Sequence, residues 1–435
     1  MDRRTRRFGG LMSGVHGVDH LLKRLFPPLV PVWAVAFGFP LWKLGLLIGA
    51  NSFGAAIGQA PMGVVSDRSD RRLLLSAGLA LIGVSVVALG TVPMLDLAIP
   101  ALTVAGSRFE GQFLLLLGVM VAAGLGSSVV HPAGYPLISA NVPEDSRGVA
   151  LGLWGSAAKF GDGLAPAMVG LLLVTLGWHE ILVAFGVLGV GYAVVLFFGL
   201  REFDTRPRDA ATADDGDGDE AAPLDRRRYL YPMLAVFAYF TVQISAANGV
   251  TVFLPQFVTS VYGYSFSVLG HQLTPESTAS FYYSALLLVA GGTQLVTGRL
   301  VDVHDSRYVL IAYLVAGAAA LFVLSAVSLP PVGLFLVLAA LGMTLWGLNP
   351  ARDALIGDIA PVAREGRTFG YLWTGALLAS SVSPAIVGYL GDVAGLQGAF
   401  ALLAGVTLLS VVPVALLLDD RVYAPTPAAS PPSDD

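Results

Sequence analysis

The feature of this chain that most constrains its fold is a series of apolar stretches, most of them about 20 residues long, separated by short polar or charged segments. Wound as a helix, a stretch of that length crosses the hydrocarbon core of a bilayer, which is about 30 Å thick. Hydrophobic residues make up 55% of the chain and charged residues only 13%, against about 25% charged residues in soluble domains. The sequence therefore predicts an all-α membrane protein that crosses the bilayer many times.

The apolar stretches form two sets of six. They predict membrane-spanning helices near residues 12–36, 41–64, 73–93, 111–138, 149–172 and 180–200, and again near 231–258, 280–300, 309–328, 334–357, 367–390 and 398–418. The segment between the sets has low hydrophobicity and mixed charge, a composition that does not support a packed fold. We therefore expect a six-helix bundle at 1–200, a flexible cytoplasmic linker at 201–230, a second six-helix bundle at 231–418 and a cytoplasmic tail at 419–435.

Basic residues are distributed unevenly between the predicted loops. If the N-terminus lies inside the cell, the inner segments collect nearly all of the arginines, whereas the outer loops hold only Lys43 and Arg108. Lys and Arg concentrate in the short cytoplasmic loops of multi-pass proteins. We predict a plasma-membrane protein with both termini in the cytoplasm.

The two sets of spans carry an internal repeat. The segment SSVVHPAGYPLISANVP is echoed by TLWGLNPARDALIGDIAP, and LAPAMVG is echoed by VSPAIVG. The offset is constant at 218 residues (350 − 132 = 218), and it relates Pro132, Pro143, Pro166, Gly124, Gly148 and Gly170 to Pro350, Pro361, Pro384, Gly342, Gly366 and Gly388. Duplicated six-span halves are typical of transporters, which bind substrate between the repeats and rock about that site.

The loops after the second and eighth predicted spans share a pattern of glycine, aspartate and arginine. The first reads GVVSDRSDRR and the second GRLVDVHDSR, which gives the residues Gly63, Asp67, Arg68, Arg71 and Arg72, and Gly298, Asp302 and Arg307. A small Gly63 would let two helices approach closely, and Asp67 would pair with Arg71 or meet the positive N-terminal end of a neighbouring helix. The alternative is that these arginines only set the topology.

These paired loops resemble the signature of the major facilitator superfamily, G-x-L-A-D-R-x-G-R-K. The resemblance covers nearly the whole chain, and it implies twelve helices in two pseudo-symmetric six-helix bundles, with the loop aspartate docking on the second half when the outside is open. The segments HGVDHLLKRLFPPLVPVW and VVHPAGYPLI look like motifs of the fosmidomycin-resistance-like branch and related drug and metabolite carriers. The chain departs from these patterns at Asp70, where the signature has Gly, and at Ala133, where the branch has Glu.

Ionisable residues occur inside the first predicted span, and a charge at the bilayer centre is costly enough that it usually lies in a cavity. His16, Asp19, His20 and Lys23 recur at three- and four-residue spacing, which places them along one helical face. We expect His16, Asp19 and Lys23 to line a water-accessible pathway for substrate or protons. Alternatively, this stripe lies at the interface and Lys23 extends toward water.

The second cluster of candidate residues lies in the later spans. Lys159 and Asp162 are three residues apart, so Lys159 would bind an anionic substrate while Asp162 holds its pair or a proton, or the two form a silent ion pair. The other candidates for a substrate or proton pathway are His131, Gln243, Asn248, Arg352 and Asp353. Each has a plainer alternative: a satisfied hydrogen bond for His131, a bond to a neighbouring helix for Gln243 and Asn248, and a helix-end charge for Arg352.

The chain lacks the motifs of nucleotide-driven or enzymatic chemistry. It has no G-x-x-x-x-G-K-[ST] loop, no H-E-x-x-H and no serine-nucleophile elbow, and it has no cysteine. We therefore expect no enzyme, cofactor, bound metal or nucleic-acid partner, but a monomeric secondary transporter in the lipid bilayer, coupled to a proton or ion gradient. Bases slightly outnumber acids within the spans, which favours an anionic or zwitterionic substrate. The alternatives are a solute sensor without transport and, within transport, multidrug efflux.

Overall fold

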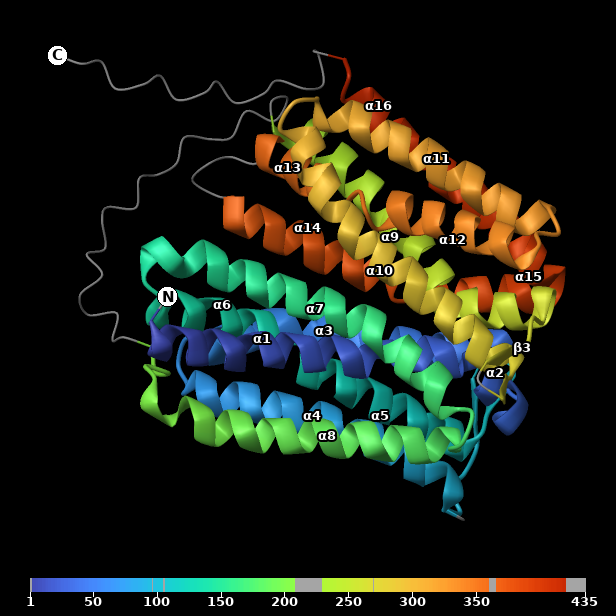
Figure 1. Ribbon diagram of the computed structural model, residues 1–435, viewed down its shortest axis with the longest axis horizontal. Coiled ribbons are helices and arrows are strands. Elements are labelled where there is room, and N and C mark those ends of the chain that lie inside the picture. The colour runs from blue at the N-terminus through green and yellow to red at the C-terminus, as the bar shows by residue number, and fades with distance from the viewer. Residues whose placement is uncertain are drawn as a thin grey trace.

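The computed structural model describes residues 2–95, 97–104, 106–207, 229–268, 270–359 and 365–419, with the side chains of 268 and 365–369 left aside. Helices dominate these residues (Figure 1). Most of the predicted linker, together with the tail after residue 419, lies outside the described residues.

The first half of the chain forms six rods, two of which are each built from two helices. They are α1 (Arg3–Arg24) with α2 (Phe26–Phe37), α3 (Leu41–Ser66), α4 (Arg71–Thr91), α5 (Gly111–Ser127) with α6 (Val130–Asn141), α7 (Glu144–Leu172) and α8 (Trp178–Gly199). Two 3-10 turns, η1 (Val92–Met94) and η2 (Leu200–Glu202), and an antiparallel hairpin of β1 (Leu102–Val104) and β2 (Ser107–Phe109) complete this half.

The second half repeats this arrangement. Its rods are α9 (Tyr231–Phe257) with the π-helical turn η5 (Val258–Tyr262), α10 (Pro275–Val301), α11 (Ser306–Ala326), α12 (Pro331–Leu345) with α13 (Asn349–Ile359), and then α14 (Glu365–Ser380), α15 (Ser383–Leu409) and α16 (Val411–Leu416). A second antiparallel hairpin joins β3 (Phe266–Val268) to β4 (His271–Leu273). The backbone of α15 turns at Gly395, where φ is 74°, so α15 contributes to both of the last two rods.

The predicted fold class, a twelve-helix bundle in two halves, is confirmed. Nine stretches of the described residues are long and apolar enough to cross a membrane, and the last of them, Gly370–Leu416, covers two predicted spans. The first and fifth predicted spans, formed by α1 with α2 and by α7, are not among the nine. These helices carry the buried residues His16, Asp19 and Asp162, so their polarity marks them as different from the rest.

Local signals explain where the rods begin and break. The first helix starts at Arg3, well before the predicted residue 12, because the side chain of Asp2 caps it by accepting a hydrogen bond from the Thr5 N–H at 2.7 Å. The break between α1 and α2 falls at Leu25, immediately before Phe26 and two prolines. A proline cannot donate the hydrogen bond that continues a helix interior.

The internal repeat appears in the packing. A Cβ atom added at Gly124 in α5 would come within 2.1 Å of the Asn51 carbonyl oxygen in α3, and one at Gly342 in α12 within 2.4 Å of the Leu286 carbonyl oxygen in α10. These glycines therefore allow equivalent helices to pack backbone against backbone in both halves.

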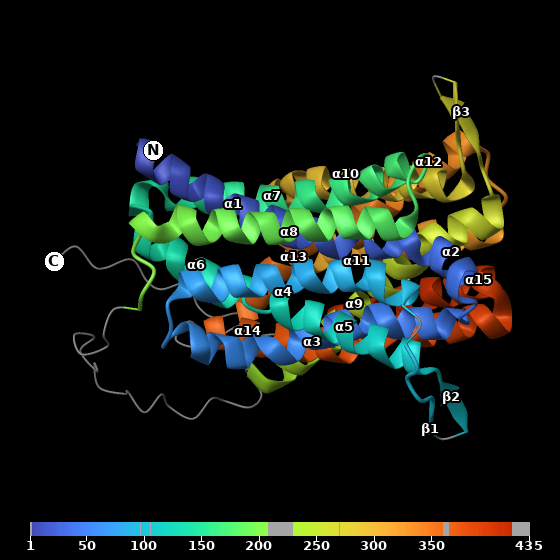
Figure 2. The same cartoon turned by 90° about the horizontal axis from the view of Figure 1, so that it is seen from below.

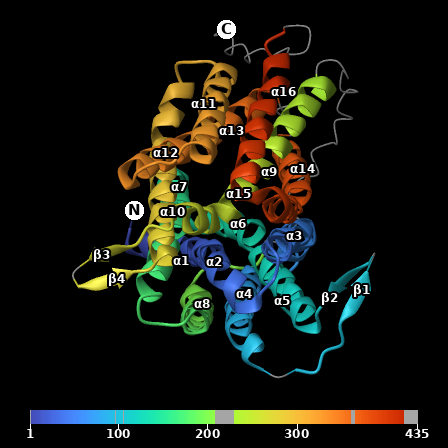
Figure 3. The same ribbon diagram turned by 90° about the vertical axis from the view of Figure 1, so that its right-hand side faces the viewer.

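The two ends of the bundle differ. We call the end with residues 2–5 and the α3–α4 loop the terminal end, and the end from which the two hairpins project on opposite sides the hairpin end (Figure 2). In Figure 1 the halves form two layers that lie closest on the right, at the hairpin end. There α3 packs on α15, α7 on α10 and α2 on α9, in the centre of the end-on view of Figure 3.

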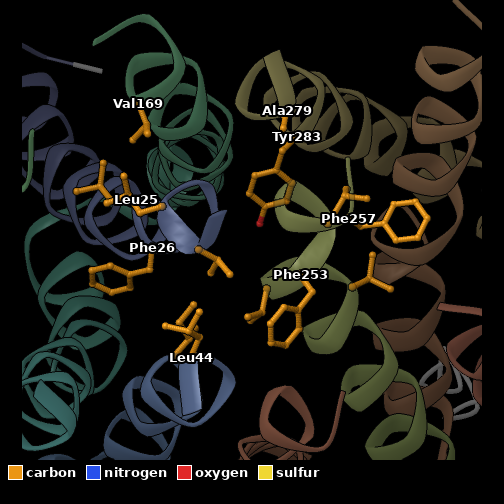
Figure 4. Close-up of a cluster of buried hydrophobic side chains, with 14 of the residues drawn as sticks. Leu25, Phe26, Leu44, Val169, Phe253, Phe257, Ala279 and Tyr283 are labelled. Carbon is orange, nitrogen blue, oxygen red and sulfur yellow. The ribbon is translucent and has the colours of Figure 1, made fainter. Parts of the chain in front are cut away.

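An apolar cluster fills the space between the halves near the hairpin end. Figure 4 shows buried apolar side chains of both halves in this cluster, with Leu25, Phe26, Leu44 and Val169 from the first half and Phe253, Phe257, Ala279 and Tyr283 from the second. All eight are buried. This cluster closes the interior on the hairpin side.

Candidate functional site

A cavity of about 240 Å³ lies between the halves beside this apolar cluster, and Phe26 belongs to both. Its walls come from α1, α2, α3, α5, α6 and α7 of the first half and from α9, α14 and α15 of the second. The polar and charged side chains that line it are His20, Lys23, Arg24, Asn51, Ser52, Gln59, Ser127, His131, Asp162, Asn248 and Thr251. The charges in this wall all belong to the first half.

Asp162 is the buried centre of an ion cluster in the cavity wall. Its Oδ1 accepts from Arg24 Nε at 2.7 Å and lies 3.0 Å from His20 Nδ1, while its Oδ2 lies 3.8 Å from Lys159 Nζ. The carboxylate side chain is 5% exposed. The helices that carry it approach closely because Gly161 faces the backbone of Gly17, where an added Cβ would lie 2.3 Å from the carbonyl oxygen.

Arg24 also reaches the other half. Its Nη1 donates to the hydroxyl of Tyr283, on α10, at 3.4 Å. One guanidinium thus contacts a carboxylate of the first half and a hydroxyl of the second. Fork-shaped guanidinium groups are suited to binding carboxylates.

Of the residues in the predicted stripe on α1, some line the cavity and others pack against neighbouring helices behind its wall. Lys23 lines the cavity and donates to Asp19 at 2.8 Å, but Asp19 is fully buried. His16 is buried against α7, where its Nδ1 lies 3.0 Å from the Trp154 carbonyl oxygen and its ring stacks on the indole at a centroid distance of 4.3 Å. The side chains of His16 and Asp19 therefore support the wall from behind.

Three histidine rings lie in contact on the terminal side of Asp162. The His16 ring is 4.7 Å from the His20 ring and 5.0 Å from the His131 ring, centroid to centroid. His131 lines the cavity and stacks on Tyr135 at 5.7 Å. This cluster connects the aspartate to Tyr135, whose side chain is about half exposed.

The second half contributes neutral groups to the cavity. Asn248 lines it and donates to the Ser380 hydroxyl at 3.0 Å. Gln243 is buried and donates to the Leu345 carbonyl oxygen at 3.0 Å. This is a hydrogen bond to a neighbouring helix, the alternative to a role in the substrate pathway.

Arg352 lies behind an aromatic wall. Its guanidinium is 4.7 Å from the centre of the Phe240 ring and 4.9 Å from that of Trp373, and it pairs with Asp353 at 2.9 Å and with Asn349 at 3.1 Å. Trp373 lines the cavity. Arg352 thus contacts a cavity-lining ring, and its charge is already partnered.

Several cavity residues were not among the sequence predictions. His20 belonged to the stripe predicted on the first span, and Arg24 continues the four-residue spacing from His16 and His20, so helical periodicity carried a signal for Arg24 as well. Trp373, which lines the cavity, and Tyr283, which accepts from Arg24 behind it, carried no such signal, because apolar spans contain many aromatic residues and only the packing selects those that reach the site.

The glycine–aspartate–arginine loops lie at the terminal end. Asp67 and Arg71 are 3.8 Å apart, and the Asp67 side chain is 75% exposed. Arg71 ties the loop to the end of the first half, because its N–H donates to the Thr205 carbonyl oxygen at 2.9 Å. Arg68 is exposed. Asp70, the departure from the signature, caps α4 by accepting from the Arg72 N–H at 2.9 Å.

The second loop has a different set of contacts. Arg307 pairs with Asp305 and donates to the Leu417 carbonyl oxygen at 2.6 Å, while Asp302 ends α10. The close helix approach expected at Gly63 is absent, and a Cβ added there or at Gly298 would meet nothing within 4 Å. The physical reason is that the described contacts between the halves gather at the hairpin end, away from both loops.

Comparison with known proteins identifies the family. Residues 12–275 and 267–434 match the sequence profile of the Major Facilitator Superfamily. The chain belongs to the major facilitator superfamily. The predicted resemblance to this superfamily is thereby confirmed. This facilitator is 22% identical over 380 residues to the protein named "Probable L-galactonate transporter" of Escherichia coli, a match that covers 82% of this chain and 76% of that protein.

Further likenesses agree with this membership. The facilitator is 23% identical over 307 residues to the "Multi-drug resistance efflux pump PmrA homolog" of Lactococcus lactis, covering 68% of this chain and 71% of that protein. Its fold resembles that of a bacterial homolog of the human lysosomal transporter Spinster, crystallised in an inward-facing and occupied conformation, with a TM-score of 0.74, 15% identity and coverage of 97% and 98% of the two chains. The facilitator is a multi-pass secondary transporter of a small molecule and not an enzyme, as predicted.

Proposed function

We propose that this facilitator carries a small organic anion together with a proton, with Lys23 and Arg24 binding the anion and Asp162 carrying the proton. The observation that carries the proposal is the Arg24–Asp162 bond of 2.7 Å in the cavity wall. With the histidines counted as neutral, the paired charges of α1 and α7 at the cavity, Lys23, Arg24, Lys159, Asp19 and Asp162, sum to 3 − 2 = +1. One net positive charge favours a monoanion.

The coupling follows from competition for Arg24. An ionised Asp162 holds the guanidinium, and a protonated Asp162 releases it to a carboxylate of the substrate. Proton and anion then bind together, so the loaded cavity has the same net charge as the empty one, which favours movement of the two in the same direction. His20 and Lys159 also contact Asp162, and the contacting rings of His16 and His131 offer the proton a path toward the terminal end.

The second half would recognise the rest of the solute. Asn248 and Thr251 offer hydrogen bonds and Trp373 a flat apolar face. The name of the L-galactonate relative agrees with a carboxylate attached to a hydroxyl-bearing body. The efflux-pump relative favours a second candidate, drug export. A volume of about 240 Å³ lies below the 300–1,000 Å³ typical of drug-sized sites, so we favour the small anion.

We propose that the terminal end faces the cytoplasm of the cell, with the protein in the plasma membrane as a monomer. The described arginines gather at that end, including Arg4, Arg7, Arg68 and Arg147, whereas Lys43 and Arg108 lie near the hairpin end. Both halves of one chain line the cavity, so a single copy suffices for the site.

The test is transport in proteoliposomes with an imposed pH gradient and a panel of labelled aldonates, sulfonates, neutral sugars and cationic dyes. We expect accumulation of an anion that a protonophore abolishes. Asp162→Asn should still exchange that anion across the membrane but lose accumulation driven by the pH gradient, and Arg24→Gln should lose both. Glu144→Gln, at the exposed start of the same helix α7, is the matched control and should behave as the parent.

Three results would overturn the proposal. Export of cationic dyes without transport of any anion in the panel would establish the efflux alternative. Saturable binding without flux would establish a sensor. Normal accumulation by Asp162→Asn would remove the aspartate from coupling.

A further inference from the structure

The start of α3 is capped by a residue of the other half. The first backbone N–H groups of a helix have no acceptor within it, and a side chain just before the helix usually supplies one. In α3 that position is Pro40, which makes no side-chain cap. The carboxylate of Asp392 on α15 takes its place, with Oδ1 2.9 Å from the Leu41 nitrogen and Oδ2 3.1 Å from the Trp42 nitrogen.

The equivalent helix of the second half has a cap of its own. Helices α3 and α10 correspond, because their loop motifs share one offset (298 − 63 = 235 and 302 − 67 = 235). In α10 the hydroxyl of Thr274 accepts from the Ser277 N–H at 3.3 Å. The repeat places Val174 where Asp392 stands in the second half (392 − 218 = 174), so no carboxylate is available there. The cap across the halves is therefore specific to the α3–α15 contact.

The two helices meet closely enough for this cap to depend on their separation. Cβ atoms added at Gly45 and Gly49 of α3 would each lie 2.2 Å from a carbonyl oxygen of α15 or the turn before it, and one at Gly388 of α15 would lie 2.4 Å from the Leu41 carbonyl oxygen. Backbone therefore packs on backbone along this contact. A movement that separates the helices also removes Asp392 from the start of α3.

We propose that Asp392 is a gating residue that stabilises the closed hairpin end by capping α3 only while the halves are in contact there. Opening leaves the Leu41 and Trp42 N–H groups and the carboxylate to water. Asp392 is exposed, so the effect is that of a helix cap and not of a buried ion pair. Loss of a cap changes an equilibrium roughly 2- to 30-fold. This inference concerns the conformational equilibrium and does not depend on which solute or ion is carried.

Spin-label distances test the proposal directly, because the natural chain has no cysteine. Labels at Val35→Cys and Val332→Cys, exposed positions of the two halves near the hairpin end, report its opening. Labels at Asp145→Cys and Val303→Cys report the terminal end. With Asp392→Ala we expect the long-distance population at the hairpin end to rise about tenfold, and the terminal-end distance to shorten.

A cap placed within the same helix separates gating from simple helix stabilisation. Pro40→Asp supplies α3 with its own cap. In the double variant Pro40→Asp, Asp392→Ala the thermal stability should return to that of the parent while the hairpin end stays open. Recovery of the parent distances in this variant, or unchanged distances in Asp392→Ala, would overturn the proposal.

Two further variants keep the test decisive if Asp392→Ala does not fold. Asp392→Asn retains one acceptor oxygen and should give a smaller shift in the same direction. Pro40→Asp alone competes with Asp392 for the same N–H groups and should also favour opening. If neither moves the hairpin-end distance, Asp392 has no gating role.

Discussion

The guanidinium of Arg24 donates its Nε–H to Oδ1 of Asp162 at 2.7 Å, in a wall where the carboxylate is 5% exposed and the arginine side chain 25% exposed. Removing one partner of a buried pair leaves an uncompensated charge, whereas removing both does not.

Arg24→Ala should therefore lower the free energy of unfolding by up to about 3 kcal/mol, the low end of the range of about 3–5 kcal/mol for breaking a buried pair. The loss should be small within that range because His20 and Lys159 still contact Asp162. The double variant Arg24→Ala, Asp162→Ala should recover much of this loss. Thermal unfolding of the purified protein followed by tryptophan fluorescence measures both. A double variant that loses the sum of the two single losses would show that the pair is not coupled.

Asp67 should matter for transport but not for the stability of this state. Its side chain is 75% exposed and its contact with Arg71 is 3.8 Å long, so Asp67→Asn should change the free energy of unfolding by less than about 0.5 kcal/mol. If Asp67 docks on a helix N-terminus of the second half in the conformation that is closed at the terminal end, transport should fall about three- to tenfold in Asp67→Asn. Asp145→Asn, exposed at the same end, is the control. Equal transport rates for both variants would leave Asp67 with a topological role only.

Gly388 should be needed for closure of the hairpin end. An added methyl group would lie 2.4 Å from the Leu41 carbonyl oxygen, and the backbone cannot yield as a flexible side chain would. Gly388→Ala should therefore open the α3–α15 contact and reduce the transport rate at least about tenfold, which corresponds to raising the activation free energy by about 1.4 kcal/mol. Gly118→Ala is the matched control, because nothing lies within 4 Å of its Cβ position. Accessibility of a single cysteine to an impermeant maleimide reports the opening, and a parent-like accessibility in Gly388→Ala contradicts the prediction.

The first hairpin should loosen in acid. Lys43 donates to Glu110 at 2.7 Å and to the Arg108 carbonyl oxygen at 3.0 Å, among the rings of Phe39, Trp42 and Phe109. The hydrogen bond from Lys43 lowers the pKa of Glu110 below its usual 4.5. A lowered pKa means that the contact stabilises the folded hairpin fully above pH 4.5 and is lost as the pH falls through the lowered value.

The mobility of a spin label at Val104→Cys measures this change. It should be independent of pH between 7 and 5 and should rise below 4.5. In Glu110→Gln it should be higher and flat across this range. A label at Val332→Cys controls for general unfolding in acid, and a parallel rise in mobility there would rule out a local cause.

The sequence by itself determined the rods and their duplication. Apolar length set the spans, and the 218-residue offset anticipated equivalent contacts such as those of Gly124 and Gly342, since closely packed positions tolerate only a small residue. It also singled out α1 as the polar helix, because charges are rare within spans.

Only the tertiary structure decided which polar residues meet. His16, Asp19 and Lys23 share one helical stripe, yet Lys23 faces the cavity while the other two pack behind it, because periodicity defines a face of a helix and not its neighbour. Asp392 and Leu41 are 351 residues apart. A hydrogen bond across that separation depends on how the two halves close on each other, and no local pattern in the chain encodes it.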